Sequence, residues 1–132
     1  MKNLFRDLTV STIDVHRETE RLREQVRALD DEQRRRFYEH ASAQLRDPDT
    51  YAVLNWMFFG VHHFYLGRWL RGAINLLIVT LAVLFMIAGL ALVGVSLVIA
   101  LSVIELLQLF RSQVIVADYN NIVQAEVLQR LV

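Results

Sequence analysis

The sequence contains no cysteine and only one proline among its 132 residues. Without cysteine, the chain can form no disulfide, no thiolate-ligated zinc site and no cysteine nucleophile. It also lacks a glycine-rich phosphate-binding loop and any serine, histidine and acid arrangement typical of hydrolases. The 14 basic side chains are matched by 14 acidic ones, so the basic excess of a nucleic-acid-binding protein is missing. We therefore expect no enzymatic activity, no cofactor and no nucleic-acid partner.

Charge is missing from one long internal segment. Residues 72–104 carry no charged side chain, whereas residues 1–50 hold ten basic and eleven acidic ones. As one helix this segment would extend about 50 Å, against a hydrocarbon core of about 30 Å. Extending it to Trp69 and Phe110 supplies two spans, and the breaker-like stretch inside it is "AGLALVG". We predict membrane-spanning helices at about 70–88 and 93–110; a single long bent helix is the less favoured alternative.

The basic residues around this hairpin predict its orientation. Arg68 and Arg71 flank the first span and Arg111 follows the second, while the connecting turn has no lysine or arginine. By the positive-inside rule, both ends then face the cytoplasm. The expected location is the inner (cytoplasmic) membrane, as a multi-pass protein with cytoplasmic N- and C-termini.

The segment 51–66 is apolar enough to enter lipid but too short to cross it comfortably. Asn55 and the two adjacent histidines would be costly in the hydrocarbon. The side chains that favour headgroup depth are Tyr51, Trp56, Tyr65 and Trp69. An interfacial or re-entrant helix fits better than a third full span, which would place the N-terminal region on the other side.

The N-terminal region 1–49 is highly charged and predicts soluble helices. Its first helix carries a narrow apolar stripe, formed by Val15, Leu22, Val26 and Leu29, that suits a partner helix. A second helix should begin at Asp30, with Gln33 in the capping-box position, and end at "RDPDT". Three favourable i,i+4 ion pairs are expected along it: Asp30 with Arg34, Asp31 with Arg35 and Glu32 with Arg36. The three arginines could touch anionic lipid, although a solvated face neutralised by its own acids is the favoured interpretation.

The C-terminal region 113–132 predicts an amphipathic helix. Apolar side chains recur there at helical spacing, namely Val116, Tyr119, Val123, Val127 and Leu131. This helix would either lie on the membrane or pack against the N-terminal helices. The tripeptide "YNN" at 119–121 is a candidate interruption.

Between these ends, the stretch "GVHHFYLGRWLRGAINLL", followed by "VIELLQLF", resembles the TM-two domain family. Bacterial members carry a Gly-x-His-Arg-Phe-Tyr-Leu-Gly pattern, which is matched here by Gly60, His62, Phe64, Tyr65, Leu66 and Gly67. His63 stands where the family has arginine, Glu105 stands for a later acid that is usually Asp, and Met57 replaces a common glycine. The likeness covers about residues 50–112. It implies a two-pass membrane protein and implies no reaction.

His62, His63 and Glu105 are the side chains best suited to bind a metal ion or carry a proton. Adjacent side chains on a helix point about 100° apart, so a shared metal ion is not favoured. A metal site would need ligands besides the two adjacent histidines. The candidates, His16, His40 and Glu105, show no recognisable ligand spacing. We expect each imidazole instead to hydrogen-bond backbone or lipid headgroups, and we predict no metal site.

Glu105 should lie about five residues inside the second span, where a charged carboxylate is costly. We predict that it meets the group formed by His62, His63, Arg68 and Arg71 and ties the second span to the motif. Alternatively it lines an ion or proton path.

The combined features favour a small membrane anchor or scaffold that acts by self-association and by binding a cytoplasmic or membrane protein. Its expected partners are therefore the lipid bilayer, further copies of the chain and such a protein. An oligomeric ion or proton channel that uses Glu105 and the histidine pair is the alternative. A metal- or haem-binding redox protein is the third hypothesis.

Overall fold

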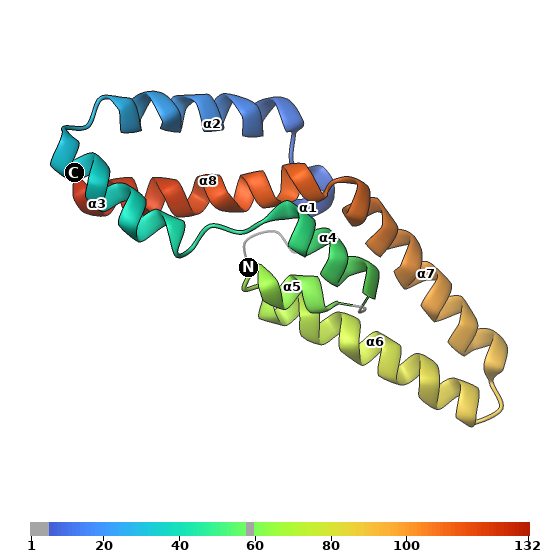
Figure 1. The fold of residues 1–132 in the computed structure, drawn as a ribbon. Coiled ribbons are helices and arrows are strands. Elements are labelled where there is room, and N and C mark those ends of the chain that lie inside the picture. Colours follow the sequence, from blue (N-terminus) through green and yellow to red (C-terminus); the bar gives the residue numbers. More distant parts are fainter. Residues whose placement is uncertain (1–5, 58–59) are drawn as a thin grey trace.

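The protein is described by a computed structural model that covers residues 6–57 and 60–132 (Figure 1). All secondary structure in these residues is helical, as the sequence predicts. The helices, in chain order, are α1 (Arg6–Thr9), α2 (Thr12–Arg27), α3 (Asp31–Ser42), α4 (Pro48–Met57), α5 (Val61–Tyr65), α6 (Trp69–Ile87), α7 (Ala91–Phe110) and α8 (Ser112–Leu131).

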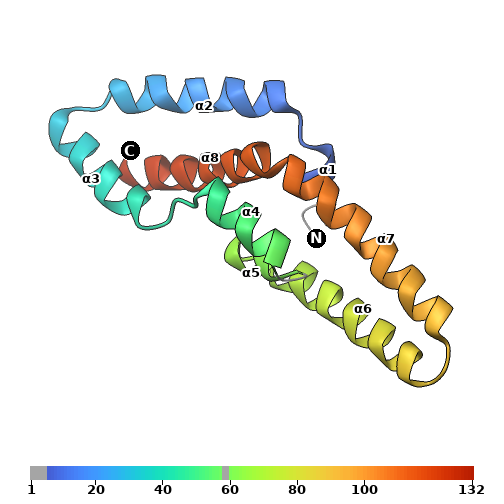
Figure 2. The same cartoon turned by 45° about the vertical axis from the view of Figure 1, so that its right-hand side comes forward.

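Helices α6 and α7 form an antiparallel hairpin that projects from the rest of the molecule (Figures 1 and 2). Both are long and apolar enough to cross a membrane. Gly89 makes the turn with a φ of +83°, a conformation that L-residues with a Cβ rarely adopt. Close packing at Gly94 brings the helices together, because a Cβ there would lie 2.5 Å from the Ala82 carbonyl oxygen. The predicted pair of helices is therefore confirmed within one or two residues, and the single bent helix is wrong.

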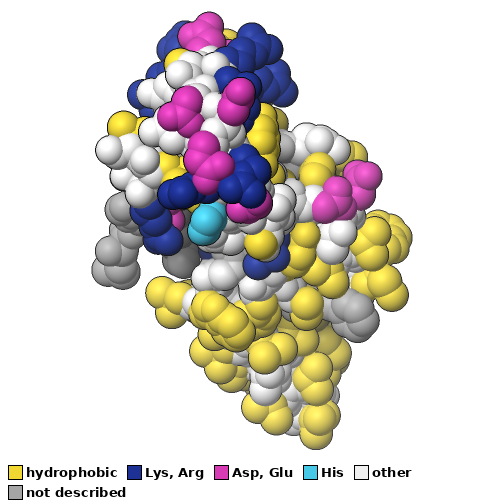
Figure 3. All heavy atoms as spheres, turned by 60° about the vertical axis from the view of Figure 1, so that its left-hand side comes forward, with side chains coloured by type: hydrophobic (Ala, Val, Ile, Leu, Met, Phe, Trp, Pro, Cys, Tyr) yellow, Lys and Arg dark blue, Asp and Glu magenta, His cyan; other side chains and the backbone are white. Residues whose placement is uncertain are grey.

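The outer surface of the hairpin is unusually apolar for a surface in contact with water. Ile87 is 79% exposed, Leu92 86% and Phe110 79%. Figure 3 shows the resulting division, with hydrophobic side chains covering one end of the molecule and charged side chains gathered at the other. An exposed apolar area of this extent is typical of a membrane or protein contact.

Helices α2, α3 and α8 form the second part of the fold. They share one apolar core, made by Leu22, Val26, Phe37, Ala41, Val127 and Leu128. The stripe predicted on the first helix thus packs against α8, and α8 packs against the N-terminal helices. Residues 119–121 do not interrupt α8.

The predicted start of α3 is confirmed by its cap. The Asp30 carboxylate accepts a hydrogen bond of 2.7 Å from the Gln33 amide. Of the three expected i,i+4 ion pairs, the described structure forms the one between Glu32 and Arg36, at 2.8 Å. Arg34 lies 3.4 Å from Asp31 instead and also donates to the Leu29 carbonyl, which joins α3 to the end of α2.

The segment predicted as one interfacial or re-entrant helix is divided between α4 and α5. Pro48 begins α4, and the Asp47 carboxylate accepts hydrogen bonds from the Thr50 amide at 2.7 Å and from its hydroxyl at 2.8 Å. The proline thus starts a helix, since α3 has already ended at Ser42. A second core joins this segment to α8 through the buried residues Tyr51, Leu66, Ile115 and Val116. Phe58 and Phe59, which belong to the segment 51–66, are outside the described residues.

Candidate polar site at the base of the hairpin

A buried polar site lies where α5 meets α6 and α7. Helix α5 is a single short turn that begins after Gly60, whose φ is +83°. A Cβ on Gly60 would lie 2.8 Å from the Cβ of Asn75 on α6, so the glycine allows both the turn and the close approach. This placement turns His62 and His63 toward α7, and both are 0% exposed.

Glu105 on α7 meets the two histidines, as the sequence predicted. Its Oε2 lies 3.0 Å from His62 Nε2, and its Oε1 lies 3.7 Å from His63 Nε2. The amide of Asn75 donates to Glu105 Oε1. The main-chain carbonyl of Glu105 accepts a bond of 3.2 Å from Asn55 on α4. The carboxylate therefore connects the motif helix to both helices of the hairpin.

The histidine rings do not behave as expected. Their centroids are 4.0 Å apart and their planes are inclined by 45°, although adjacent helical positions diverge by about 100°. The predicted bonds to backbone or headgroups are wrong for His62, because its Nε2 lies 3.1 Å from Gln108 Oε1 and faces Glu105. Both nitrogens of His63 lack a hydrogen-bond partner among the described residues. A one-turn helix leaves its side chains free to turn to the same side.

Burial keeps both histidines neutral. Desolvation, with a contribution from the neighbouring imidazole, lowers the pKa of His62 to about 4. Desolvation also lowers the pKa of His63 to about 3. Neutral imidazole carries one free ring nitrogen, which can accept a hydrogen bond or bind a metal ion.

Arg68 and Arg71 are not partners of Glu105 in the ion-pair network, which corrects the sequence-based expectation. Both pair with Asp7 of α1: Arg71 donates to Asp7 Oδ2 at 3.0 Å, and Arg68 contacts Asp7 Oδ1. Asp7 is 1% exposed. Burial, together with the neighbouring Arg71, lowers the pKa of Arg68 to about 10, which leaves it charged at neutral pH. The partner of both guanidiniums is thus the acidic side chain of α1, a helix that packs against α7.

Further contacts hold this N-terminal segment in place. Arg6 forms a bidentate pair with Asp118 of α8, with distances of 2.8 and 2.7 Å. Arg111, the single residue between α7 and α8, donates to the Val10 carbonyl. The beginning of the described chain is thus bonded to both the hairpin and α8.

The remaining motif residues have packing roles. The ring of Phe64 lies over Gly72, where a Cβ would come within 2.6 Å of it. The Tyr65 hydroxyl accepts a bond of 3.0 Å from the Asp47 amide, and its ring lies 5.0 Å from the Arg46 guanidinium. Gly67 ends the α5 turn with a φ of +68°.

Two polar partners in the site, Asn75 and Gln108, were not singled out from the sequence. Each has a readable signal. Asn75 is a polar side chain inside the uncharged run, and Gln108 lies three residues after Glu105, on the same helical face. Asp7 gives no such signal, because it is one acid among eleven in the first 50 residues.

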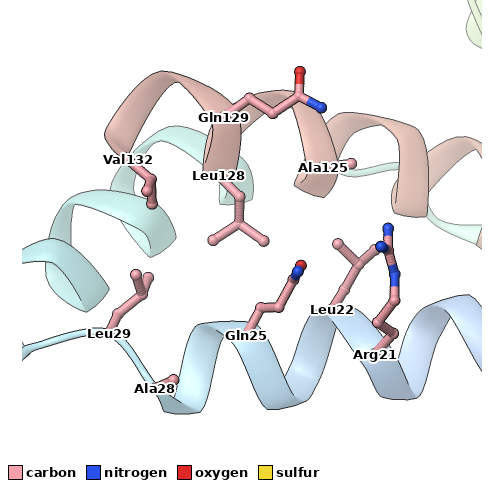
Figure 4. Close-up of a pocket in the computed structure, with 9 residues that line it drawn as sticks. All are labelled: Arg21, Leu22, Gln25, Ala28, Leu29, Ala125, Leu128, Gln129 and Val132. Atoms are coloured by element: carbon pink, nitrogen blue, oxygen red, sulfur yellow. The ribbon is translucent and has the colours of Figure 1, made fainter.

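A separate groove of about 420 Å³ lies between α2 and α8, and its lining shares no residue with this site. Figure 4 shows side chains from both helices pointing into it. Its lining is mostly apolar and contains one charged side chain, with residues Arg21, Leu22, Gln25, Ala28, Leu29, Ala125, Leu128, Gln129 and Val132.

Comparisons of the chain with protein-family models, curated proteins and solved structures find no match. The likeness to the TM-two domain family therefore depends on the motif residues alone.

Proposed function

We propose that this protein is a membrane-anchored scaffold that acts by self-association and protein contact. The observation that carries the proposal is the short, ion-paired connection between an apolar hairpin and a charged helical layer. Only Arg111 separates α7 from α8. Asp7 and Asp118 hold α1 to α6 and α8 respectively. A span that is fixed in this way to soluble helices positions those helices at the membrane surface.

Charge on the helical layer is neutralised within each helix. Arg21 lies 2.6 Å from Glu18, Arg23 lies 2.6 Å from Glu20, and Arg35 lies 2.9 Å from Glu32. A face of paired charges has little net attraction for anionic lipid. This supports protein contact, rather than lipid binding, as the role of the exposed helices.

The orientation can be tested directly because the chain has no native cysteine. We would introduce Ile13→Cys, Leu92→Cys and Val132→Cys singly, at positions that are 70%, 86% and 90% exposed. In inverted and right-side-out vesicles, an impermeant maleimide should label positions 13 and 132 only from the cytoplasmic side. Position 92 should label only from the opposite side or be protected. Labelling of 13 and 132 from opposite sides would refute the two-pass arrangement.

Self-association is tested by light scattering in mild detergent and in lipid nanodiscs. A mass of at least two chains is expected. The residues 1–49 should not be deleted for this test, because α2 and α3 supply four of the six buried residues of the core that they share with α8. The scaffold proposal would be overturned if the mass is that of a strict monomer and if crosslinking in membranes also recovers no other protein with it.

The channel alternative has less support. Thr80, Ser96 and Ser102, the hydroxyl side chains of the two long helices, each hydrogen-bond to a carbonyl of their own helix. Glu105 lies at the base of the hairpin rather than along it. Ion flux through wild-type protein in liposomes, reduced by Glu105→Gln, would nevertheless favour the channel over the scaffold.

A further inference from the structure

We propose that His62, His63 and Glu105 form a binding site for a divalent transition-metal ion, for which Zn²⁺ is the best fit. The three side chains come from α5 and α7 and are all buried. One ligand atom from each lies within 4.8 Å of the other two. Two imidazole nitrogens and one carboxylate oxygen are ligands that Zn²⁺ takes in proteins.

The spacing of these atoms suits one shared ion. Ligands held about 2.0–2.2 Å from a tetrahedral ion lie about 3.3–3.6 Å from one another. The separations between Glu105 and the two imidazoles are 3.0 Å for His62 Nε2 and 3.7 Å for His63 Nε2. Small side-chain rotations would bring both to the required distance.

The hydrogen bonding of the site is incomplete without a ligand. His63 Nε2 is buried and has no hydrogen-bond partner among the described residues, and Glu105 Oε2 accepts no hydrogen bond there, although His62 Nε2 lies 3.0 Å from it. Buried polar atoms without partners are rare because each costs free energy. In the tautomer of His63 that leaves Nε2 unprotonated, a single cation between them would satisfy both atoms.

Neighbouring groups would support the ion. Asn75 holds Glu105 Oε1 through its amide. Gln108 Oε1 is 3.1 Å from His62 Nε2, within reach of a fourth position, and the edge of Tyr51 packs on the His62 ring at a centroid distance of 5.0 Å. Such surrounding contacts fix the orientation of metal ligands. The bound ion would join the short motif helix to the second span.

The test uses full-length protein in detergent, treated with a chelator and then titrated with Zn²⁺ while its unfolding temperature is measured. One equivalent should bind and raise that temperature. His63→Gln and Glu105→Gln should each weaken binding by at least about 100-fold, since even supporting residues contribute 10–100-fold. His16→Ala and His40→Ala are the matched controls, because both histidines are exposed on other helices, and they should bind Zn²⁺ like wild type.

Co²⁺ provides a readout that does not depend on the variants folding. Wild-type protein should give the intense visible absorption of a four- or five-coordinate ion, and Zn²⁺ should displace it. His63→Gln is expected to fold, because the His63 ring makes no hydrogen bond among the described residues. Equal Zn²⁺ affinity in wild type and His63→Gln, dependence on His16 or His40, or only the weak spectrum of six-coordinate Co²⁺ would each overturn the proposal.

Discussion

Substitution of Asp7 by asparagine gives the strongest test of how the N-terminal segment is held. Asn has nearly the same shape but no charge. It would leave the guanidinium groups of Arg68 and Arg71 without the acid that now pairs with both. The change removes the charge of a residue that the sequence alone does not distinguish from its many acidic neighbours.

The expected cost follows from burial. The side chain of Asp7 is 1% exposed, that of Arg71 8% and that of Arg68 23%. Removal of one partner from a buried ion pair typically costs about 3–5 kcal/mol, because the remaining charge stays desolvated. Arg68 can turn partly to water, so the lower end, about 3 kcal/mol of unfolding free energy, is expected. That is a large fraction of a typical total of about 5–15 kcal/mol.

The assay is denaturant unfolding in detergent micelles, followed by far-ultraviolet circular dichroism. Asp14→Asn is the matched control, because Asp14 pairs with Arg17 at 3.5 Å on an exposed face and should contribute no more than about 0.5 kcal/mol. Arg71→Met and the Asp7→Asn/Arg71→Met double variant complete a cycle, in which the double variant should lose less than the sum of the single losses. A loss of under about 0.5 kcal/mol for Asp7→Asn, equal to the control, would refute the buried pair.

Two further changes test the site and the helix before it. Gly60→Ala should destabilise the protein by about 1–3 kcal/mol in the same unfolding assay, because it adds strain at a φ of +83° and places a Cβ 2.8 Å from the Cβ of Asn75. The control is Gly67→Ala, which should cost less because Gly67 has a positive φ but open space around it. Equal losses of stability in the two variants would contradict the close approach. Asp47→Ala should lower the unfolding temperature and loosen the start of α4 in hydrogen exchange, because it removes the acceptor for the Thr50 amide. The hydrogen bond from that amide lowers the pKa of Asp47 below its ordinary 3.8. The stabilisation by Asp47 is therefore complete above pH 3.8 and is lost as the pH falls through the lowered pKa. An unfolding temperature that responds identically to acid in wild type and Asp47→Ala would argue against this role of Asp47.

The elements that the sequence predicted best are those set by a local or periodic signal. The hairpin follows from an uncharged run of known length, and the start of α3 follows from the cap at Asp30. The contact of Glu105 with the histidines was also predictable, because a carboxylate inside an apolar span needs a polar partner at the same depth. Each of these inferences uses residues whose surroundings are fixed by their neighbours in the chain.

The errors have a common physical origin in tertiary contacts. Arg68 and Arg71 could have paired with Glu105 by depth, and only the tertiary placement of α1 brings Asp7 to them. The histidine rings were expected to diverge as on a long helix, but α5 has five residues and both rings turn toward α7. The three metal-ligand candidates therefore show no recognisable ligand spacing, since Glu105 follows His62 by 43 positions and His63 by 42 and meets them by packing alone.

The pairing of Asp7 with Arg71 has a consequence for how the chain is assembled. Asp7 is synthesised first and Arg71 follows 64 residues later, so the ion pair cannot form until the start of α6 has been synthesised. In a hairpin that crosses a bilayer, the two residues can meet only where the N-terminal helix and the beginning of α6 lie on the same side of it. The bond therefore excludes an arrangement with α1 and the start of α6 on opposite sides, and α1 is fixed in place only after the segment that forms α6 has been made.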